Sequence, residues 1–144
     1  MDELKNRRIF IVDDNVTNLA VFGASLRRSG ARVFQDAWTV GTVRQVLQFL
    51  PIDVILLDLM LRNQTSGYDM FDELTKYPEL AGVPIIAVSA ADPGTEIPKA
   101  KAKGFAGYIG KPIRPRLFPE QIAACINGKH IWYVPDGNWE ETTR

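Results

Sequence analysis

Short apolar runs that end in polar residues constrain the fold of this chain more than any other feature of its sequence. The runs 9–12, 54–57 and 85–88 are rich in Val and Ile, and segments with helical spacing separate them. Runs of this length and composition are typical of buried strands in a parallel sheet whose two faces are covered by helices. The pattern therefore predicts an α/β protein with a doubly wound parallel sheet.

Five β-α units fit the spacing along the chain, which predicts a five-stranded sheet in the flavodoxin-like order 2-1-3-4-5. The fourth helix is expected to be short and to start near Pro98, because Pro93 and Pro98 interrupt its pattern and proline fits only the first turn of a helix. Strands are expected at 8–12, 31–35, 53–58, 84–88 and 105–109, and the other helices at about 15–29, about 40–50, around Phe71 and Leu74, and at about 115–126.

Polar side chains follow four of the predicted strands, at the point where each strand ends. Asp13 and Asp14 follow the first strand, Asp58 ends the third, Ser89 follows the fourth, and Lys111 lies just beyond the fifth. Because the carboxyl ends of parallel strands meet at one edge of the sheet, where such folds bind ligands, these side chains are expected to converge. The sequence therefore predicts an acidic pocket with one ammonium group.

Three carboxylates in one pocket repel each other, and one of them would hold a proton unless a cation compensated their charge. Magnesium suits this donor set, because it binds one or two carboxylates together with water and phosphate oxygens. The Lys111 ammonium and the Ser89 hydroxyl add donors for a phosphoryl group, so the pocket predicts phosphoryl-transfer chemistry. The competing interpretation treats acids as N-caps and turn residues, which we accept for Asp36, Asp53, Asp69, Asp92 and Asp136.

Composition argues against several other classes of function. The 144 residues suit one domain, and 17 basic and 17 acidic residues give a formal net charge of zero, so no nucleic-acid partner is expected. No apolar stretch approaches the roughly 20 residues of a membrane helix, so we expect no membrane partner and a cytoplasmic protein. Cys125 is the only cysteine and His130 is the only histidine of the chain, which argues against a Cys/His metal cluster. Ser-His or Cys-His catalysis also has little support. Cys125 is interpreted as a small buried residue rather than a reactive thiol.

The order and spacing of the polar motifs resemble the receiver domain of two-component response regulators, in its single-domain form. Residues 12–15 resemble the acidic pair of the family, 57–60 its phosphoacceptor, 88–90 its hydroxyl switch, and 104–112 its last strand and lysine. The intervals that separate Asp14, Asp58, Ser89 and Lys111 are 44, 31 and 22 residues, and they match the family as well. The resemblance covers about residues 6–128, so residues 1–128 are expected to form the receiver domain.

The resemblance implies a phosphorylation-dependent signalling switch. Asp58 would accept a phosphoryl group from a phosphohistidine on a sensor histidine kinase or a histidine phosphotransfer protein. The implied Mg²⁺ ligands are Asp13, Asp14, Asp58 and the carbonyl of Met60.

Three more residues have roles that the resemblance implies. Ser89 and Lys111 would contact the phosphate, and Tyr108 would swing inward as Ser89 moves; a packed edge aromatic is an equal interpretation for Tyr108. A cis peptide bond is implied between Lys111 and Pro112. Output would pass to a downstream protein target by protein–protein interaction, through a surface formed by the fourth helix, the fifth strand and the fifth helix.

Two departures from the family pattern concern the loop after the phosphoacceptor. Arg62 stands where the family usually has proline, and the loop to Gly67 is one residue longer, so loop shape and partner choice stay open. Arg62 is interpreted as a solvated charge, with a reach toward the phosphate as the alternative.

In the family, the residues that flank the hydrolytic water lie two positions beyond the phosphoacceptor and two beyond the hydroxyl switch, which are Met60 and Ala91 here. Neither can position a water, so the resemblance implies slow self-dephosphorylation and no dedicated enzyme activity. The alternative is that Met60 only caps the edge of the core and that the lifetime is set elsewhere.

Residues 129–144 form an aromatic C-terminal extension that breaks the β-α pattern. The run 131–134 and Trp139 flank a Pro-Asp-Gly-Asn turn, and they are too aromatic for a solvated tail. We expect the extension to pack on its own domain; a homodimer contact, or a place inside a longer protein, is the alternative.

Two other functions compete with the switch. A receiver-like scaffold or binding module would not be phosphorylated, but the presence of Asp58, Lys111 and the acidic pair argues against it. A hydrolase or a flavodoxin-like cofactor protein is less favoured, because no Asp-x-Asp nucleophile motif and no glycine-rich phosphate loop follow the first strand. The kinase, the target and the sign of the response cannot be read from the sequence.

Overall fold

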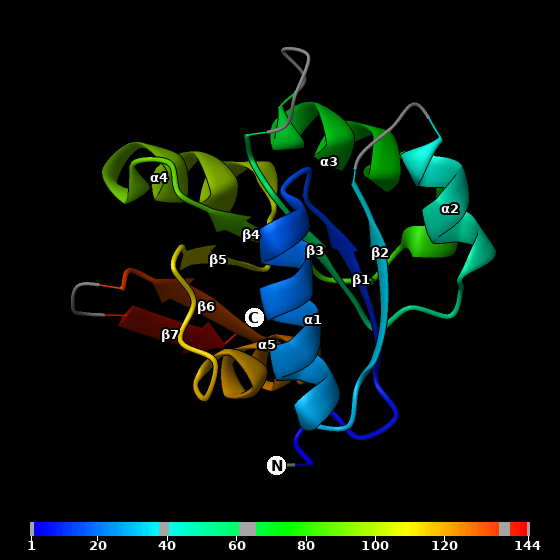
Figure 1. Cartoon of the computed structure of the whole chain (residues 1–144). Helices are drawn as coiled ribbons and strands as arrows, with labels where there is room; N and C mark the ends of the chain where they lie inside the picture. Colours follow the sequence, from blue (N-terminus) through cyan, green and yellow to red (C-terminus); the bar gives the residue numbers. More distant parts are fainter. Residues whose placement is uncertain (1, 38–40, 61–65, 136–138, 144) are drawn as a thin grey trace.

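The computed structural model of the protein describes residues 2–37, 41–60, 66–135 and 139–143. Its strands form one sheet in the order β2-β1-β3-β4-β5-β6-β7 (Figure 1). The predicted order of the first five strands is confirmed, and all pairs among them are parallel. The strands are β1 (Arg8–Val12), β2 (Arg32–Asp36), β3 (Val54–Leu57), β4 (Ile85–Ser89), β5 (Gly107–Gly110), β6 (Lys129–Tyr133) and β7 (Trp139–Thr143).

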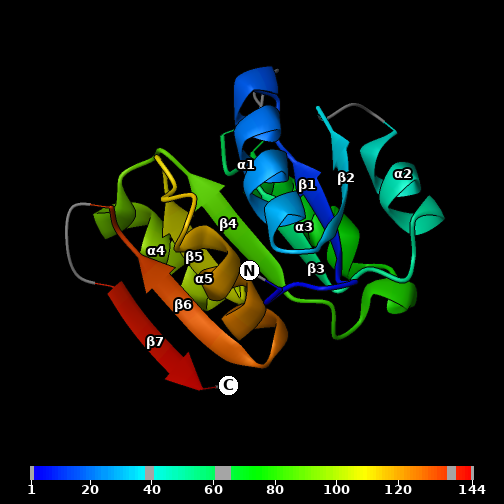
Figure 2. The ribbon, with the colours of Figure 1, turned by 60° about the horizontal axis from the view of Figure 1, so that its bottom comes forward.

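Helices cover both faces of this sheet, as the sequence predicts. α1 and α5 lie on one face, and α2, α3 and α4 lie on the other (Figures 1 and 2). Within the described parts of the chain, no helix combines the length and apolar character that a membrane span requires. The helices are α1 (Val16–Arg28), α2 (Thr42–Gln48), α3 (Gly67–Thr75), α4 (Pro93–Lys103) and α5 (Phe118–Ile126), with a short 3-10 turn η1 (Pro78–Leu80).

The central strands are buried on both faces, which explains why their sequences are continuously apolar. In β1, Ile9 and Ile11 pack into the cluster that α1 and α5 cover, whereas Phe10 and Val12 pack into the cluster on the opposite face. Successive side chains of a strand point to opposite faces, so each central strand contributes to both clusters. This double burial fixes the carboxyl ends of the strands, where the polar residues lie.

The fourth helix is longer than the sequence predicts. α4 begins at Pro93, and Pro98 lies inside it, so the prediction of a start near Pro98 is wrong. Pro98 lacks the N–H that would bond to the carbonyl of Gly94, but both residues are exposed, so water can satisfy that carbonyl. Gly104, at φ 107°, then ends the helix in the left-handed conformation that glycine tolerates.

The C-terminal extension continues the sheet beyond the five predicted strands. β6 pairs in parallel with β5, with Ile131 opposite Gly107 and Trp132 opposite Tyr108, and β7 pairs antiparallel with β6. Ile131, Trp132 and Tyr133 are all buried. β5 therefore does not lie at the edge of the sheet, since the extension covers its outer side (Figure 2).

Candidate functional site

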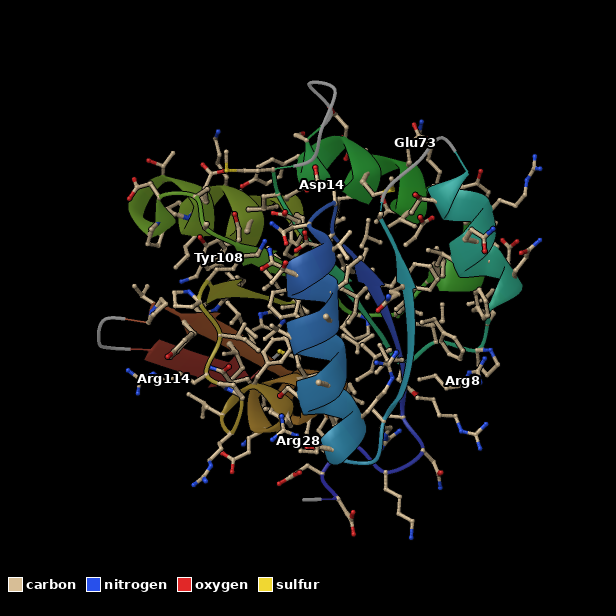
Figure 3. All side chains as sticks on the ribbon, in the orientation of Figure 1. Arg8, Asp14, Arg28, Glu73, Tyr108 and Arg114 are labelled. Carbon is tan, nitrogen blue, oxygen red and sulfur yellow. The ribbon has the colours of Figure 1, made fainter. Side chains whose placement is uncertain are left out.

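The polar residues that follow β1, β3 and β5 come together at one end of the sheet. The register pairs Val12 with Leu57, so the residues that follow them, Asp13 and Asp58, are neighbours. Figure 3 shows Asp14 at the same end, beside the start of α1. Asp13 and Asp58 are only 1% and 6% exposed, so this end of the sheet holds two nearly buried carboxylates.

The start of α1 fixes the orientation of the Asp13 carboxylate. Its Oδ1 accepts a hydrogen bond from the Asn15 backbone N–H at 2.8 Å. Its Oδ2 accepts a longer one, at 3.4 Å, from the Asn18 side-chain amide. Asn15 is also the N-cap of α1, because its side chain accepts from the Asn18 backbone N–H. The capping residue of the helix is therefore part of the site, a role that the sequence analysis missed although Asn is a common N-cap.

The Lys111 ammonium joins the two buried carboxylates. Its Nζ lies 2.9 Å from Asp13 Oδ2 and 3.3 Å from Asp58 Oδ2. The Lys111 backbone N–H donates to the Ser89 carbonyl at 2.8 Å, which ties the β5–α5 segment to the end of β4. The peptide bond between Lys111 and Pro112 is cis, as predicted. The predicted lysine therefore reaches the acidic pocket from a different strand than either carboxylate.

Asp58 carries the clearest electrostatic conflict of the site. Burial raises the pKa of its carboxyl above the ordinary value, and the Asp13 carboxylate adds to this rise, while the Lys111 ammonium opposes it. Oδ1 of Asp58 accepts from the Met60 backbone N–H at 3.1 Å, so both of its oxygens have a donor. The raised pKa of Asp58 means that, without a further cation, the folded protein disfavours the charged form of this carboxyl group.

Three carboxylates of the site could share one metal ion. Asp13, Asp14 and Asp58 each offer an oxygen, and these oxygens lie within 4.8 Å of one another. An all-oxygen donor set suits a hard cation such as Mg²⁺, and a cation here would remove the charge conflict at Asp58. The residues present therefore fit a magnesium ion. Met60, the fourth predicted ligand, lies beside them with a side chain that is 62% exposed.

Gly67 supports the end of β3 in a way the sequence analysis did not recognise. A Cβ at this position would collide with the carbonyl oxygen of Asp58 and the Cα of Leu59. The Gly67 N–H donates to the Leu59 carbonyl at 2.9 Å, so the start of α3 is bound to the end of β3. The signal was the glycine itself, because close approach of two backbones requires one. The predictions for Arg62 concern a residue outside the described part of the chain.

Ser89, the last residue of β4, and Tyr108 of β5 are both hydrogen-bonded to the backbone of Ala91, just after β4. Ser89 is fully buried, and its Oγ accepts from the Ala91 backbone N–H at 3.1 Å. Tyr108 is also fully buried, and its hydroxyl donates to the Ala91 carbonyl at 2.9 Å. Burial raises the pKa of the Tyr108 hydroxyl to about 12. The tyrosine is therefore in an inward position, tied to the same backbone segment as the serine (Figure 3).

A small cavity of about 160 Å³ connects this segment to the C-terminal extension. Ser89, Ala91 and Lys111 line one side, and Val134 and Pro135, at the end of β6, line another. The sequence analysis did not place the extension near the site. The position of residues 134–135 follows from the pairing of β6 with β5, which a local pattern does not reveal.

Comparisons with known proteins agree with this geometry. The family model described as response regulator receiver domain matches residues 9–123. The chain belongs to the response regulator receiver domain family. Protein PilH of Pseudomonas aeruginosa is 30% identical over 121 residues, which are 84% of this chain and 98% of PilH. The polar-differentiation response regulator DivK of Brucella ovis is 28% identical over 120 residues, 83% of this chain and 96% of DivK.

Solved receiver structures share the fold of this receiver domain. A CheY-like receiver domain protein from Methanospirillum hungatei JF-1 has a TM-score of 0.73 at 24% identity, and covers 85% of this chain and 95% of its own. Chemotaxis protein CheY4 of Vibrio cholerae has a TM-score of 0.74 at 18% identity, and covers 81% of this chain and 96% of its own. At these identities the structural likeness supports the fold alone.

Proposed function

We propose that this receiver domain is a phosphorylation-dependent switch that accepts a phosphoryl group on Asp58 from a phosphohistidine, in a cytoplasmic two-component pathway or phosphorelay. The observation that carries the proposal is the environment of Asp58. Its carboxylate lies between the Lys111 ammonium and two further acids, in a pocket that disfavours its own negative charge without a cation. A metal ion held by these carboxylates would offset their negative charge and would also neutralise the oxygens of a phosphoryl group on Asp58.

The reaction is an in-line transfer. An Oδ atom of Asp58 forms a bond to phosphorus as the bond from phosphorus to the donor imidazole nitrogen breaks, and the imidazole then takes up a proton. Mg²⁺, held by Asp13, Asp14 and Asp58 with the Met60 carbonyl, would supply positive charge to the phosphoryl oxygens. The Lys111 ammonium would add positive charge to the same oxygens, and it already contacts Asp58 in this structure.

The signal would pass through the segment after β4. The phosphoryl group adds a charge near −2 beside Ser89, and a hydroxyl that turns toward it must give up the Ala91 N–H it now accepts. Because Tyr108 donates to the carbonyl of that same Ala91, the segment cannot move without affecting the tyrosine hydrogen bond. A downstream protein target would read the altered surface.

An exposed apolar rim beside the acids suits a protein phosphodonor. Val16 is 74% exposed and Met60 is 62% exposed, although both are large apolar residues. They lie two residues after Asp14 and Asp58 in the sequence and so border the acidic pocket. We assign this rim to the helix that carries the phosphohistidine in a sensor kinase or phosphotransfer protein.

Incubation with a small phosphodonor and Mg²⁺, followed by intact-mass measurement, tests this function. The wild type should gain one phosphoryl group, and Asp58→Asn should gain none while it keeps its fold. Asp72→Asn, which alters an exposed acid paired with Lys103, is the matched control and should still be phosphorylated. A chelator should abolish the reaction. If Asp58→Asn is labelled as well as wild type, Asp58 is not the phosphoacceptor. If neither wild type nor any variant is labelled under any condition, the non-phosphorylated scaffold becomes the better function.

Slow loss of the phosphoryl group is the second property we propose. Met60 and Ala91 flank the line along which water must approach, and neither side chain can hold a water there. The double variant Met60→Asn with Ala91→Glu should therefore lose the phosphoryl group several-fold faster than wild type. Equal decay in Mg²⁺ buffer would show that these positions do not set the lifetime.

A further inference from the structure

The outer neighbour of Tyr108 in the sheet is a strand of the C-terminal extension. Trp132 of β6 stands opposite Tyr108 of β5, and the two side chains belong to the same apolar cluster. Trp132 is only 5% exposed, so its indole is packed inside that cluster on the β6 side of Tyr108. A Tyr108 ring that turned toward the outer edge of the sheet would enter the volume that the indole occupies, and close-packed interiors do not tolerate such overlap.

Trp132 is itself fixed from two directions. The Lys101 ammonium of α4 lies 5.0 Å from the centre of its ring, within the range of a cation–π interaction. The His130 ring meets it edge-on, at 5.8 Å between centroids. The indole is therefore held between α4 and its own strand, and it cannot easily make room for the tyrosine.

Glycines on β5 let the extension approach closely. A Cβ on Gly107 would lie 2.7 Å from the carbonyl oxygen of Ile131, and a Cβ on Gly110 would lie 2.7 Å from Cδ of Pro135. The Arg114 guanidinium also donates to the Pro135 carbonyl at 3.1 Å. The extension is therefore seated along β5 and reaches the β5–α5 segment beyond it.

We propose that the β6–β7 extension is a built-in clamp that keeps Tyr108 in its inward position whether or not Asp58 is phosphorylated. The unphosphorylated half of this inference stands on the packing alone, and the phosphorylated half rests on the proposed function. With the ring position fixed, the parts left to respond to phosphorylation are the Ser89 hydroxyl and the 89–91 segment. That segment faces Val134 and Pro135 across the small cavity, so a partner would read the extension instead of the edge of β5.

Fluorine NMR of protein labelled with 3-fluorotyrosine can test the clamp. The chain has four tyrosines, and loss of one signal in Tyr108→Phe identifies the Tyr108 resonance. The change in its shift between H₂O and D₂O reports contact of the ring with solvent. In the wild type this change should be small both before and after treatment with a small phosphodonor and Mg²⁺. Intact mass of the same samples reports whether Asp58 is modified.

The decisive variant is Trp132→Leu, which shortens the clamp but keeps an apolar side chain. Its unphosphorylated form should show a larger solvent effect on Tyr108 than wild type. Tyr133→Phe is the matched control on the opposite face of β6; its hydroxyl has no hydrogen-bond partner among the described residues, so Tyr108 should not change. If Trp132→Leu does not fold, as judged by circular dichroism, Trp132→Phe makes the same test with a smaller loss of volume.

Any of three results would overturn the clamp. One is a solvent-exposed Tyr108 resonance in unphosphorylated wild type, and another is the same exposure in wild type whose mass shows phosphorylation. The third is a Tyr108 that stays as buried in the Trp132 variants as in wild type. If the samples never gain mass, the phosphoacceptor assignment fails instead, and the comparison of unphosphorylated wild type with Trp132→Leu still decides the clamp.

Discussion

The acidic end of the sheet and its outer part, where β6 pairs with β5 inside the edge strand β7, are built by opposite means. At the acidic end, two nearly buried carboxylates share one ammonium, and burial raises the pKa of the Asp58 carboxyl, so the charged form of this group lowers the stability of the fold. In the outer part, Tyr108, Trp132 and Tyr133 are buried in apolar clusters, and burial of each large side chain contributes about 1.5–3 kcal/mol. The comparison teaches that a pocket whose buried charges lower the stability of the fold is flanked by a closely packed region, which holds the residues of the pocket in place.

The largest expected effect is the loss of packing in the outer part of the sheet. Trp132→Ala should lower the free energy of unfolding by about 3–5 kcal/mol, because it leaves a cavity beside Tyr108. Urea unfolding of the variant and wild type measures this loss. Val21→Ala, at an apolar residue of α1 that is 44% exposed, is the control and should change stability by less than about 0.5 kcal/mol. Equal losses in the two variants would remove the contrast between a packed outer part and an ordinary surface.

Magnesium should act on the acidic end with the next largest effect. An ion that binds only the folded protein stabilises it by about 2.7 kcal/mol at a hundredfold excess over its dissociation constant. Melting curves across a Mg²⁺ titration should show this rise in the wild type and in Asp72→Ala. Asp14→Ala, which removes one of the three clustered carboxylates, should abolish it. A wild-type melting temperature that ignores millimolar Mg²⁺ would contradict the metal site.

Gly110→Ala probes how closely the two regions are joined. The new Cβ would overlap the Pro135 ring, so a loss of about 1–3 kcal/mol in unfolding free energy is expected. Combination with Pro135→Ala should recover part of that loss, which a double-mutant cycle measures. Gly94→Ala is the control, since a Cβ there meets Asp92 at an ordinary 3.6 Å and alanine favours a helix. Additive effects of the Gly110 and Pro135 substitutions would show that the contact does not constrain the extension.

The smallest expected effect is a gain in stability for Asp58→Asn in metal-free buffer. Because the pKa of the folded Asp58 carboxyl is raised, its favourable contribution is complete below the unfolded pKa, about 3.9, and is lost as pH rises through the folded value. The amide of the Asp58→Asn variant does not ionise, so the variant does not lose stability in this way as pH rises. The melting temperature of Asp58→Asn relative to wild type should therefore be higher at pH 7 than at pH 4, with a chelator present. The opposite trend would mean that the Lys111 ammonium outweighs burial.

Much of the acidic end could be predicted because its geometry follows from a general property of parallel sheets. Strands buried on both faces have a recognisable apolar sequence, and their carboxyl ends meet at one edge. These two properties are enough to predict from the sequence that Asp13, Asp14, Asp58 and Lys111 lie together. The sequence did not reveal the backbone roles, which depend on the local path of the chain. Examples are the hydrogen bond from the Asn15 N–H to Asp13 and the close approach of Gly67 to Asp58.

The outer part of the sheet could be predicted only incompletely. The apolar run 131–134, followed by a Pro-Asp-Gly-Asn turn, has the form of a strand that enters a hairpin, and it correctly indicated a buried segment. A strand pattern does not say which edge it will join, because pairing depends on which edge is open in the folded domain. The length of α4 was missed for a related reason. The cost of Pro98 inside a helix depends on whether water reaches the Gly94 carbonyl, and exposure is a property of the fold.

The antiparallel pairing of β7 with β6 has a consequence for how copies of this protein can associate. Strands of neighbouring molecules can add to the open edge of a sheet, and β7 forms that edge on this side of the described structure. Each strand occupies about 4.8 Å, so a molecule added here would lie about 10 Å farther from Tyr108 than one added directly to β5. Association through the β7 edge would therefore leave two strands between Tyr108 and the neighbouring molecule.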